Sequence, residues 1–297
     1  MAPTRHDTMR RALRREVAGT IGLVADEDDF AAMRRYRTFT FDDHDTYLQQ
    51  VEALLRTLAA QGRHTAVVLF DPEEYEEYCA SAGLDPDTPD SRTRFTAELS
   101  ASGAAVRYEG QPLTDLLPDL VDEAVRQATW EYATMALAAS GNCTTCGEDI
   151  GRASFTRASQ LITRAVHTSG AGTRHLVCSV PAENQNLFAA LHIEIDEDGG
   201  ARLDDTEALE FATVLAAGIA TRRAAGLVLR TSADGTRDRV QGWRLRAGRF
   251  HPLTAAEVFD AYCTDATTGE LISPESGVDY CAAPDLEDDQ PEGGHTH

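Results

Sequence analysis

Hydrophobic and polar residues follow two alternating periods along the first half of the chain. Apolar residues at helical spacing predict helices, and these helices are separated by short β-prone runs. The predicted strands are residues 20–25, 38–41, 64–70 and 104–108, and the predicted helices are residues 26–37, 46–62, 71–83, 91–102 and 118–140. Strands that alternate with helices favour an α/β domain, with a mixed or parallel sheet flanked by helices.

The second half of the chain has a less regular pattern. After a Gly- and Thr-rich loop, we expect helices at residues 153–167, 205–226 and 255–262 and strands at residues 175–180, 187–195, 227–230 and 242–250. This order predicts an α+β part. The expected organisation is an Arg-rich N-terminal helix (1–17), an α/β domain (18–141), a zinc-stabilised α+β domain (142–283) and a disordered acidic tail (284–297).

Charge narrows the range of partners. Asp and Glu number 49 against 27 basic residues, all of them Arg, and the net charge is −22. Such a surface repels phosphate backbones, so binding to nucleic acid is not expected. The single basic cluster is Arg10, Arg11, Arg14 and Arg15, which we interpret as a solvated helical face.

The apolar segments and the cysteines indicate where in the cell the protein is expected. Residues 1–17 lack the apolar segment of a signal peptide, and Arg222 and Arg223 interrupt the long aliphatic stretch at 212–229. Six cysteines without a secretion signal favour reduced thiols or a bound metal over disulfides. We therefore expect a cytoplasmic protein that makes no membrane contact.

The strongest chemical signal is a possible zinc site. Cys143 and Cys146, followed by Gly147, form a C-x2-C-G turn, and His175 and Cys178 repeat the two-residue gap 28 residues later. The turn resembles the knuckle of zinc ribbons and rubredoxin-like sites over five residues. Together the four side chains predict a Cys3His site for Zn(2+). Because four protein ligands fill the tetrahedral shell, the site is expected to be structural and not catalytic.

Other interpretations of these residues stay open. Cys178 lies in an apolar run and is also compatible with a buried thiol of the core. The C-x2-C pair is also compatible with a redox pair, although such pairs usually begin a helix that follows a strand. His167 is the reserve ligand in case His175 faces away from the cysteines.

A second, weaker signal comes from acidic residues at predicted strand ends. Asp26, Asp42, Asp71 and Glu109 each follow a strand, and in a parallel sheet they would converge on one edge. Converging carboxylates bind Mg²⁺ or Mn²⁺ and can activate water. The arrangement is similar to that of PIN-like and Toprim nuclease domains, although no motif of either group is present. The competing interpretation is that Asp42, Asp43 and Asp71 cap the helices that follow them.

The functional prediction follows mainly from the charge and the closed zinc site. We expect an accessory or regulatory protein that acts through protein–protein binding, with a partner whose surface is basic. The alternative is a divalent-metal-dependent phosphoesterase or nuclease that uses the strand-end carboxylates. A third possibility is mimicry of DNA by rows of acids, but the acids in this sequence show no regular phosphate-like spacing.

Overall fold

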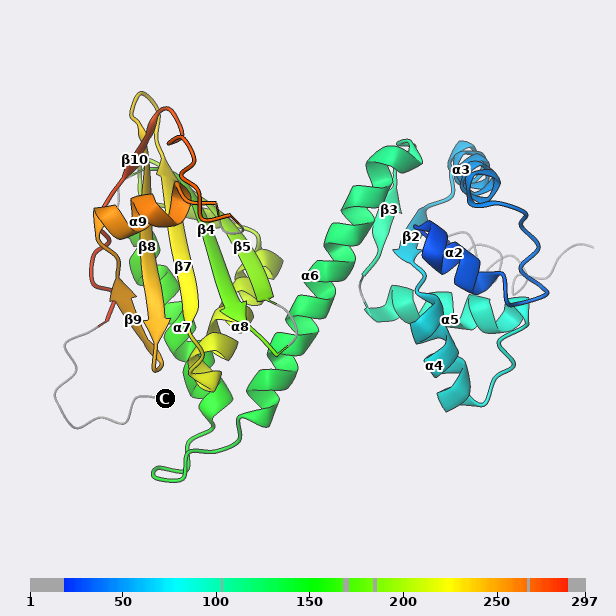
Figure 1. Cartoon of the computed structure of the whole chain (residues 1–297), viewed down its shortest axis with the longest axis horizontal. Helices are drawn as coiled ribbons and strands as arrows, with labels where there is room; N and C mark the ends of the chain where they lie inside the picture. The colour runs from blue at the N-terminus through cyan, green and yellow to red at the C-terminus, as the bar shows by residue number, and fades with distance from the viewer. Residues whose placement is uncertain (1–18, 103, 168–170, 184–185, 266–267, 288–297) are drawn as a thin grey trace, which may run out of the picture. The chain divides into compact units, whose positions relative to one another are not determined.

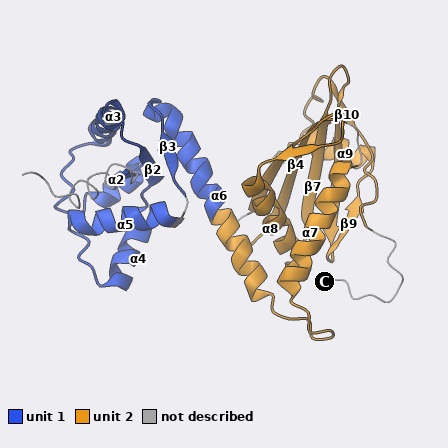
Figure 2. Ribbon diagram, turned by 180° about the vertical axis from the view of Figure 1, so that it is seen from behind, with its two compact units in different colours: residues 1–127 blue, residues 128–297 orange. Residues whose placement is uncertain are grey.

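The chain forms two compact units in a computed structural model, residues 1–127 and residues 128–297 (Figures 1 and 2). The structure describes residues 19–102, 104–167, 171–183, 186–265 and 268–287. The expected N-terminal helix (1–17) and most of the expected acidic tail (284–297) lie outside these residues. Each unit is described by itself below.

Unit 1 is built on a three-stranded mixed sheet in the order β1-β2-β3. Strand β1 (Gly19–Leu23) runs parallel to β2 (Thr65–Leu69), and β2 runs antiparallel to β3 (Val106–Tyr108). The helices are α2 (Glu27–Met33), α3 (His44–Ala60), α4 (Pro72–Ala82), α5 (Pro89–Ser102) and α6 (Leu113–Ala139). One apolar core fills this unit, and Leu23, Leu55 and Leu116 are among its fully buried members.

Helix ends in unit 1 follow from local chemistry. The Asp71 carboxylate accepts hydrogen bonds from the backbone N–H groups of Glu73 and Glu74, and Pro72 occupies the first turn of α4, where its missing N–H costs nothing. Gly83 ends the helix at a φ of 65°, a left-handed conformation that favours glycine. These boundaries confirm the helix that the sequence predicts at residues 71–83.

Unit 2 contains a larger sheet in the order β10-β8-β7-β4-β5-β6, with β9 paired to β8. Its neighbouring strands are antiparallel, except that β10 runs parallel to β8. The strands are β4 (Gly172–Pro181), β5 (Asn186–Ile195), β6 (Ala201–Leu203), β7 (Ala225–Ser232), β8 (Asp238–Arg246), β9 (Arg249–Pro252) and β10 (Val278–Tyr280).

Helices cover the two faces of this sheet unequally. Helices α7 (Ile150–His167) and α8 (Asp205–Thr221) lie together on one face, and α9 (Ala255–Tyr262) lies on the other (Figures 1 and 2). Alternate residues of β7 are buried, because every second side chain faces the helices. Trp243 lies in this core, and its indole N–H donates to the Pro284 carbonyl oxygen at 2.7 Å.

The mixed α/β prediction is therefore confirmed at the level of fold class. Two details differ from the predicted elements and boundaries. Residues 38–41 form no strand, since no neighbouring strand pairs with them in the described structure. The two units divide inside α6 and not at residue 141, because the C-terminal turns of α6 pack into the unit 2 core through Tyr132, Ala133 and Leu137.

Among the described residues, no helix is both long enough and apolar enough to cross a membrane.

Candidate functional site

The four expected zinc ligands do not come together. His175 and Cys178 both lie on β4, where side chains alternate between faces, so an odd separation directs them to opposite sides of the sheet. Cys178 is fully buried on the helix-covered side, and burial raises the pKa of its thiol to about 12. His175 lies on the other side, where its ring stacks on that of His192 with the ring centroids 4.2 Å apart. The expected Cys3His set is thus corrected: one ion cannot reach both residues.

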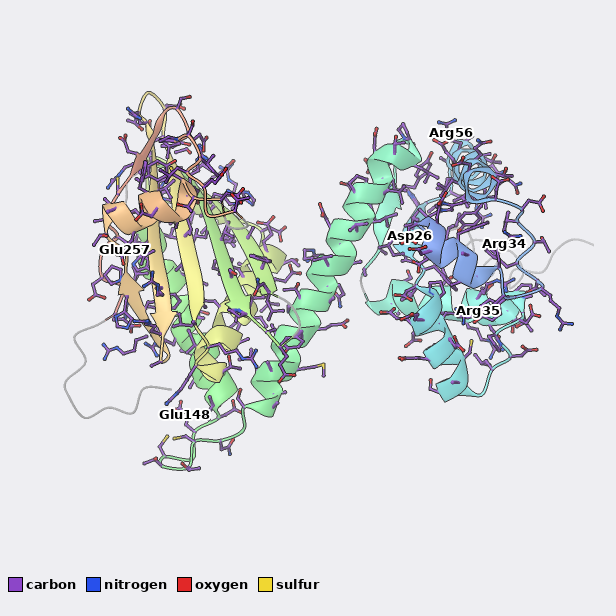
Figure 3. The ribbon with its side chains drawn as sticks, in the orientation of Figure 1. Asp26, Arg34, Arg35, Arg56, Glu148 and Glu257 are labelled. Carbon is purple, nitrogen blue, oxygen red and sulfur yellow. The ribbon has the colours of Figure 1, made fainter. Side chains whose placement is uncertain are left out.

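The C-x2-C-G loop itself adopts an ordered turn between α6 and α7. The backbone N–H of Gly147 donates to the Cys143 carbonyl oxygen at 2.9 Å, and Gly147 has a φ of 76°. The backbone N–H groups of Cys146 and Thr145 donate to the Cys143 sulfur and lower the pKa of that thiol. Glu148 lies in the same loop (Figure 3).

The four strand-end acids are only partly brought together. Asp26 and Asp71 follow the parallel strands β1 and β2 and therefore lie at the same edge of the sheet. Glu109 follows β3, whose antiparallel direction places it at the opposite edge, beside the start of β2. Asp42 is exposed in the turn before α3, which Asp43 caps. The four acids therefore do not converge as expected, because β3 runs antiparallel to β2 and because residues 38–41, which precede Asp42, form no strand.

Asp26 and Asp71, the two acids at the same edge, each cap the helix that follows. The Asp26 carboxylate accepts from the backbone N–H of Asp29 at 2.8 Å, at the start of α2 (Figure 3). Burial, followed by repulsion from Asp26 and Asp71, raises the pKa of Asp29 to about 6. No group of three or more His, Cys, Asp or Glu side chains within the described ranges is arranged to hold a metal ion. This edge is an acidic cluster without a recognisable cation site.

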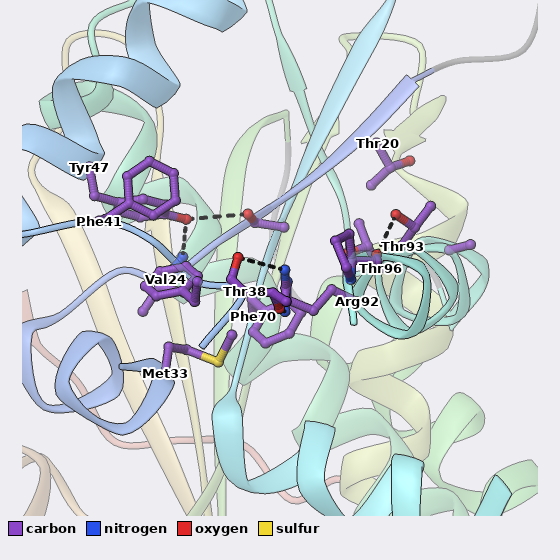
Figure 4. Close-up of a pocket in the computed structure, with 14 residues that line it drawn as sticks. Thr20, Val24, Met33, Thr38, Phe41, Tyr47, Phe70, Arg92, Thr93 and Thr96 are labelled. Atoms are coloured by element: carbon purple, nitrogen blue, oxygen red, sulfur yellow. Dashed lines mark hydrogen bonds between the residues drawn. The ribbon is translucent and has the colours of Figure 1, made fainter. Parts of the chain in front are cut away.

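A cavity of about 490 Å³ lies inside unit 1 and is the best candidate for a functional site. This volume is within the range of small-molecule binding sites. β1, α5, the end of α2, the start of α3 and the segment around residues 38–41 all contribute to its wall (Figure 4). The lining residues are Thr20, Gly22, Val24, Met33, Thr38, Phe39, Phe41, Tyr47, Phe70, Pro89, Arg92, Thr93, Thr96 and Ala97.

One side of the cavity is aromatic. The rings of Phe39 and Phe41 lie 5.0 Å apart, and Phe41 lies 5.0 Å from Tyr47, in edge-to-face arrangements that aromatic pairs prefer. The Tyr47 hydroxyl accepts a hydrogen bond from the backbone N–H of Val24 at 3.1 Å, which anchors the ring against the end of β1. The alternating segment that resembled a strand in the sequence therefore supplies a wall of this cavity.

The other side is polar and carries one positive charge. Thr20, Thr93 and Thr96 lie opposite the aromatic rings (Figure 4). Between them, Arg92 donates to the hydroxyl and the carbonyl oxygen of Thr38 at 2.9 and 3.2 Å. Within the described ranges Arg92 forms hydrogen bonds to these neutral oxygens and no ion pair with a carboxylate. No Asp or Glu is among the residues that line the cavity.

Close packing of the backbone shapes the floor of the cavity. A Cβ atom at Gly22 would lie 2.9 Å from both the Phe70 ring and the Thr96 hydroxyl oxygen, so only glycine lets β1 approach α5 this closely. The sequence pattern did not identify Arg92, Thr93 or Thr96 as site residues. On a polar helix of this kind, nothing in the spacing separates a side chain that lines a cavity from one that faces water.

Comparison with known proteins adds one partial match. Residues 8–111 match a family described as a domain of unknown function (DUF8829). No match was found among curated proteins, and none among solved structures. The matched stretch contains every residue that lines the cavity and stops before the cysteine loop. The similarity to this family is therefore confined to unit 1.

Proposed function

We propose that the protein is a non-catalytic regulatory protein of the cytoplasm whose N-terminal unit binds a small ligand with an apolar, aromatic body and a negatively charged group. The observation that carries this proposal is the lining of the cavity. In a chain with 49 acidic residues, the cavity wall contains one guanidinium and no carboxylate. The aromatic side would hold the body of the ligand, and Arg92 would pair with its anion.

The lining also supports binding over catalysis. The described wall contains Thr, Tyr and Arg as its polar residues and offers no His, Cys, Asp or Glu as a general base. The phosphoesterase alternative has less support, because its four carboxylates do not share one edge of the sheet.

The test uses 2-naphthoate and its neutral counterpart 2-naphthamide as probes of the cavity. Saturation-transfer NMR and calorimetry on the full chain should show that the acid binds more tightly. Arg92→Gln should weaken naphthoate roughly 10-fold or more, since a hydrogen bond to a charged group contributes ~1.5–3 kcal/mol. Thr93→Trp should block both probes, because Thr93 lines the cavity and a larger side chain there would take up part of its volume.

Arg94→Gln is the matched control, because Arg94 lies on the same helix, is exposed and pairs with Asp90 outside the cavity. It removes the same charge and should leave naphthoate binding unchanged. Equal affinity for the acid and the amide, or equal effects of the Arg92 and Arg94 substitutions, would contradict the proposed role of Arg92. Failure of both probes to bind the wild-type chain would contradict the ligand class.

A protein partner is a second candidate, favoured by exposed apolar side chains on β4 and β5 of the unit 2 sheet. Val177 is 36% exposed and Phe188 is 59% exposed on neighbouring strands, on the side away from α7 and α8. A partner with basic groups around an apolar patch would complement the net charge of −22. Benzoylphenylalanine at position 188 should crosslink a basic protein in cells, whereas at the exposed Leu271 it should not. The same products at both positions would contradict this assignment.

A further inference from the structure

The loop between α6 and α7 holds Cys143 and Cys146 in one backbone turn. Its two arms are held together by a bridge between Asn142 and Asp149 and by the Cys143 N–H, which donates to the Glu148 carbonyl oxygen at 2.8 Å. Gly151 fixes the base of the loop, since a Cβ there would lie 2.8 Å from the Leu137 carbonyl oxygen. The turn is thus a defined structure anchored on two helices.

Inside this turn the two sulfurs lie side by side. The Cys143 sulfur contacts the Cys146 side chain and also receives the backbone N–H groups of Thr145 and Cys146. Gly147 takes the left-handed conformation that lets the chain turn back at this point. The two cysteines of the turn are therefore close enough to contribute two ligands to one tetrahedral ion.

The described residues around the loop do not supply the third and fourth ligands that a zinc ion would need. Residues 144–149 are exposed, and the loop extends beyond the ends of α6 and α7, away from the sheet of unit 2 (Figures 1 and 2). His175 and Cys178 belong to the sheet and face opposite sides of it. The part of the chain that the structure describes contains no third His, Cys, Asp or Glu in position to complete a metal site. A closed zinc site needs four ligands.

We propose that two copies of this chain share one zinc ion, each contributing Cys143 and Cys146 from the loop between α6 and α7. A tetrahedral ion fits this arrangement because a two-fold axis can pass through it, which makes the two loops equivalent. The exposed position at the end of two helices lets a second loop approach without contact between the larger surfaces. The site is a link between chains and is independent of the ligand proposed for unit 1.

The net charge makes the proposed pairing depend on salt. Each copy carries a net charge of −22, and the exposed Glu148 and Asp149 follow the C-x2-C-G turn in the same loop. Repulsion between two such chains opposes pairing at low ionic strength and is screened as salt is added. Zinc-dependent pairing should therefore strengthen between about 0.05 M and about 0.5 M NaCl, the opposite of an association driven by unlike charges.

The experiment uses the full chain, purified without a His tag, reduced and stripped of metal, with zinc returned stepwise. Light scattering should show the mass rising from 32.2 kDa to twice that value, and mass spectrometry should find one zinc ion for every two chains. Chelator should reverse both. Cobalt in place of zinc should give the thiolate charge-transfer bands of a four-sulfur site, which reports the ligands without any substitution.

Substitutions separate this site from its rivals. Cys143→Ser and Cys146→Ser should each abolish zinc retention and pairing, and circular dichroism checks that they remain folded. Cys281→Ser removes a thiol far from the loop in sequence, and His175→Ala removes the formerly expected ligand; both should leave zinc and mass unchanged. One zinc per monomeric chain would overturn the proposal in favour of ligands from the same chain. No retained zinc would overturn it in favour of a plain thiol pair.

Discussion

Replacement of Asp29 by Asn should stabilise the protein at neutral pH. Burial comes first among the causes that raise the pKa of this carboxyl to about 6, followed by repulsion from Asp26 and Asp71. A carboxyl whose pKa is raised in the folded state disfavours folding once it is ionised. Asn has a similar shape and no charge, so the variant loses this penalty.

The size of the effect follows from the pKa difference. A rise from the ordinary value of 3.8 to about 6 corresponds to at most ~3 kcal/mol at ~1.36 kcal/mol per pH unit. Asp29 is only partly shielded from water, so screening reduces the expected gain to roughly 1 kcal/mol. The gain should be complete above pH 6, decline as the pH falls and vanish below about 3.8, where the carboxyl is protonated in both states.

Urea unfolding at several pH values, read from NMR signals of unit 1, measures this gain. Asp28→Asn is the control, because Asp28 is exposed in the same first turn of α2 and loses the same favourable interaction with the helix dipole. A carboxyl titration by ¹³C NMR reports the pKa of Asp29 directly. A midpoint near 3.8, or a gain that does not change with pH, would refute the reasoning.

Three further outcomes are expected. Tyr47→Phe should cost ~1–3 kcal/mol and speed the amide exchange of Val24, whose buried N–H loses its acceptor; unchanged exchange would contradict this. Trp243→Phe should cost ~2–4 kcal/mol in urea unfolding, because it removes both packing volume and the bond to the Pro284 carbonyl oxygen, and a loss below ~0.5 kcal/mol would argue against that contact. Raising NaCl from about 0.1 M to about 1 M should raise the unfolding midpoint by screening the net charge of −22; a fall would show that local ion pairs outweigh the general repulsion.

Local signals in the sequence predicted local structure well. Asp71 and Pro72 predicted the start of α4, and Gly83 predicted its end, because capping depends on the backbone within a few residues. The helix predicted from residue 205 likewise begins there, because the Asp204 carboxylate accepts from the N–H groups of Thr206 and Glu207. Such interactions need no knowledge of the distant chain.

Strand direction could not be predicted in this way. Periodicity shows that residues 106–108 are β-prone, but a strand has the same pattern whether it runs up or down the sheet. The direction of β3 is set by its pairing with β2, and it moves Glu109 to the other edge from Asp71. Likewise, Phe39 and Phe41 alternate with threonines as a strand would, yet they pack on Tyr47.

The alternation of side chains along a strand separates His175 from Cys178. Residues 175–180 were expected to form a strand, and on a strand His175 and Cys178 must face opposite sides, because their separation is odd. The same two-residue gap brings two sulfurs together only in a turn, as at Cys143 and Cys146. Spacing in a motif has meaning only with the local structure on which it is placed.

The cavity of unit 1 combines two opposing electrostatic effects. A net charge of −22 repels an anion at a distance, whereas the guanidinium of Arg92 attracts it once it has entered the cavity. Salt screens the distant charges more strongly than a close, partly buried contact. An anionic ligand should therefore arrive faster as the ionic strength rises, while its dissociation rate, set by the contacts inside the cavity, changes little. This pattern separates binding at Arg92 from simple attraction to exposed arginines, which salt would weaken.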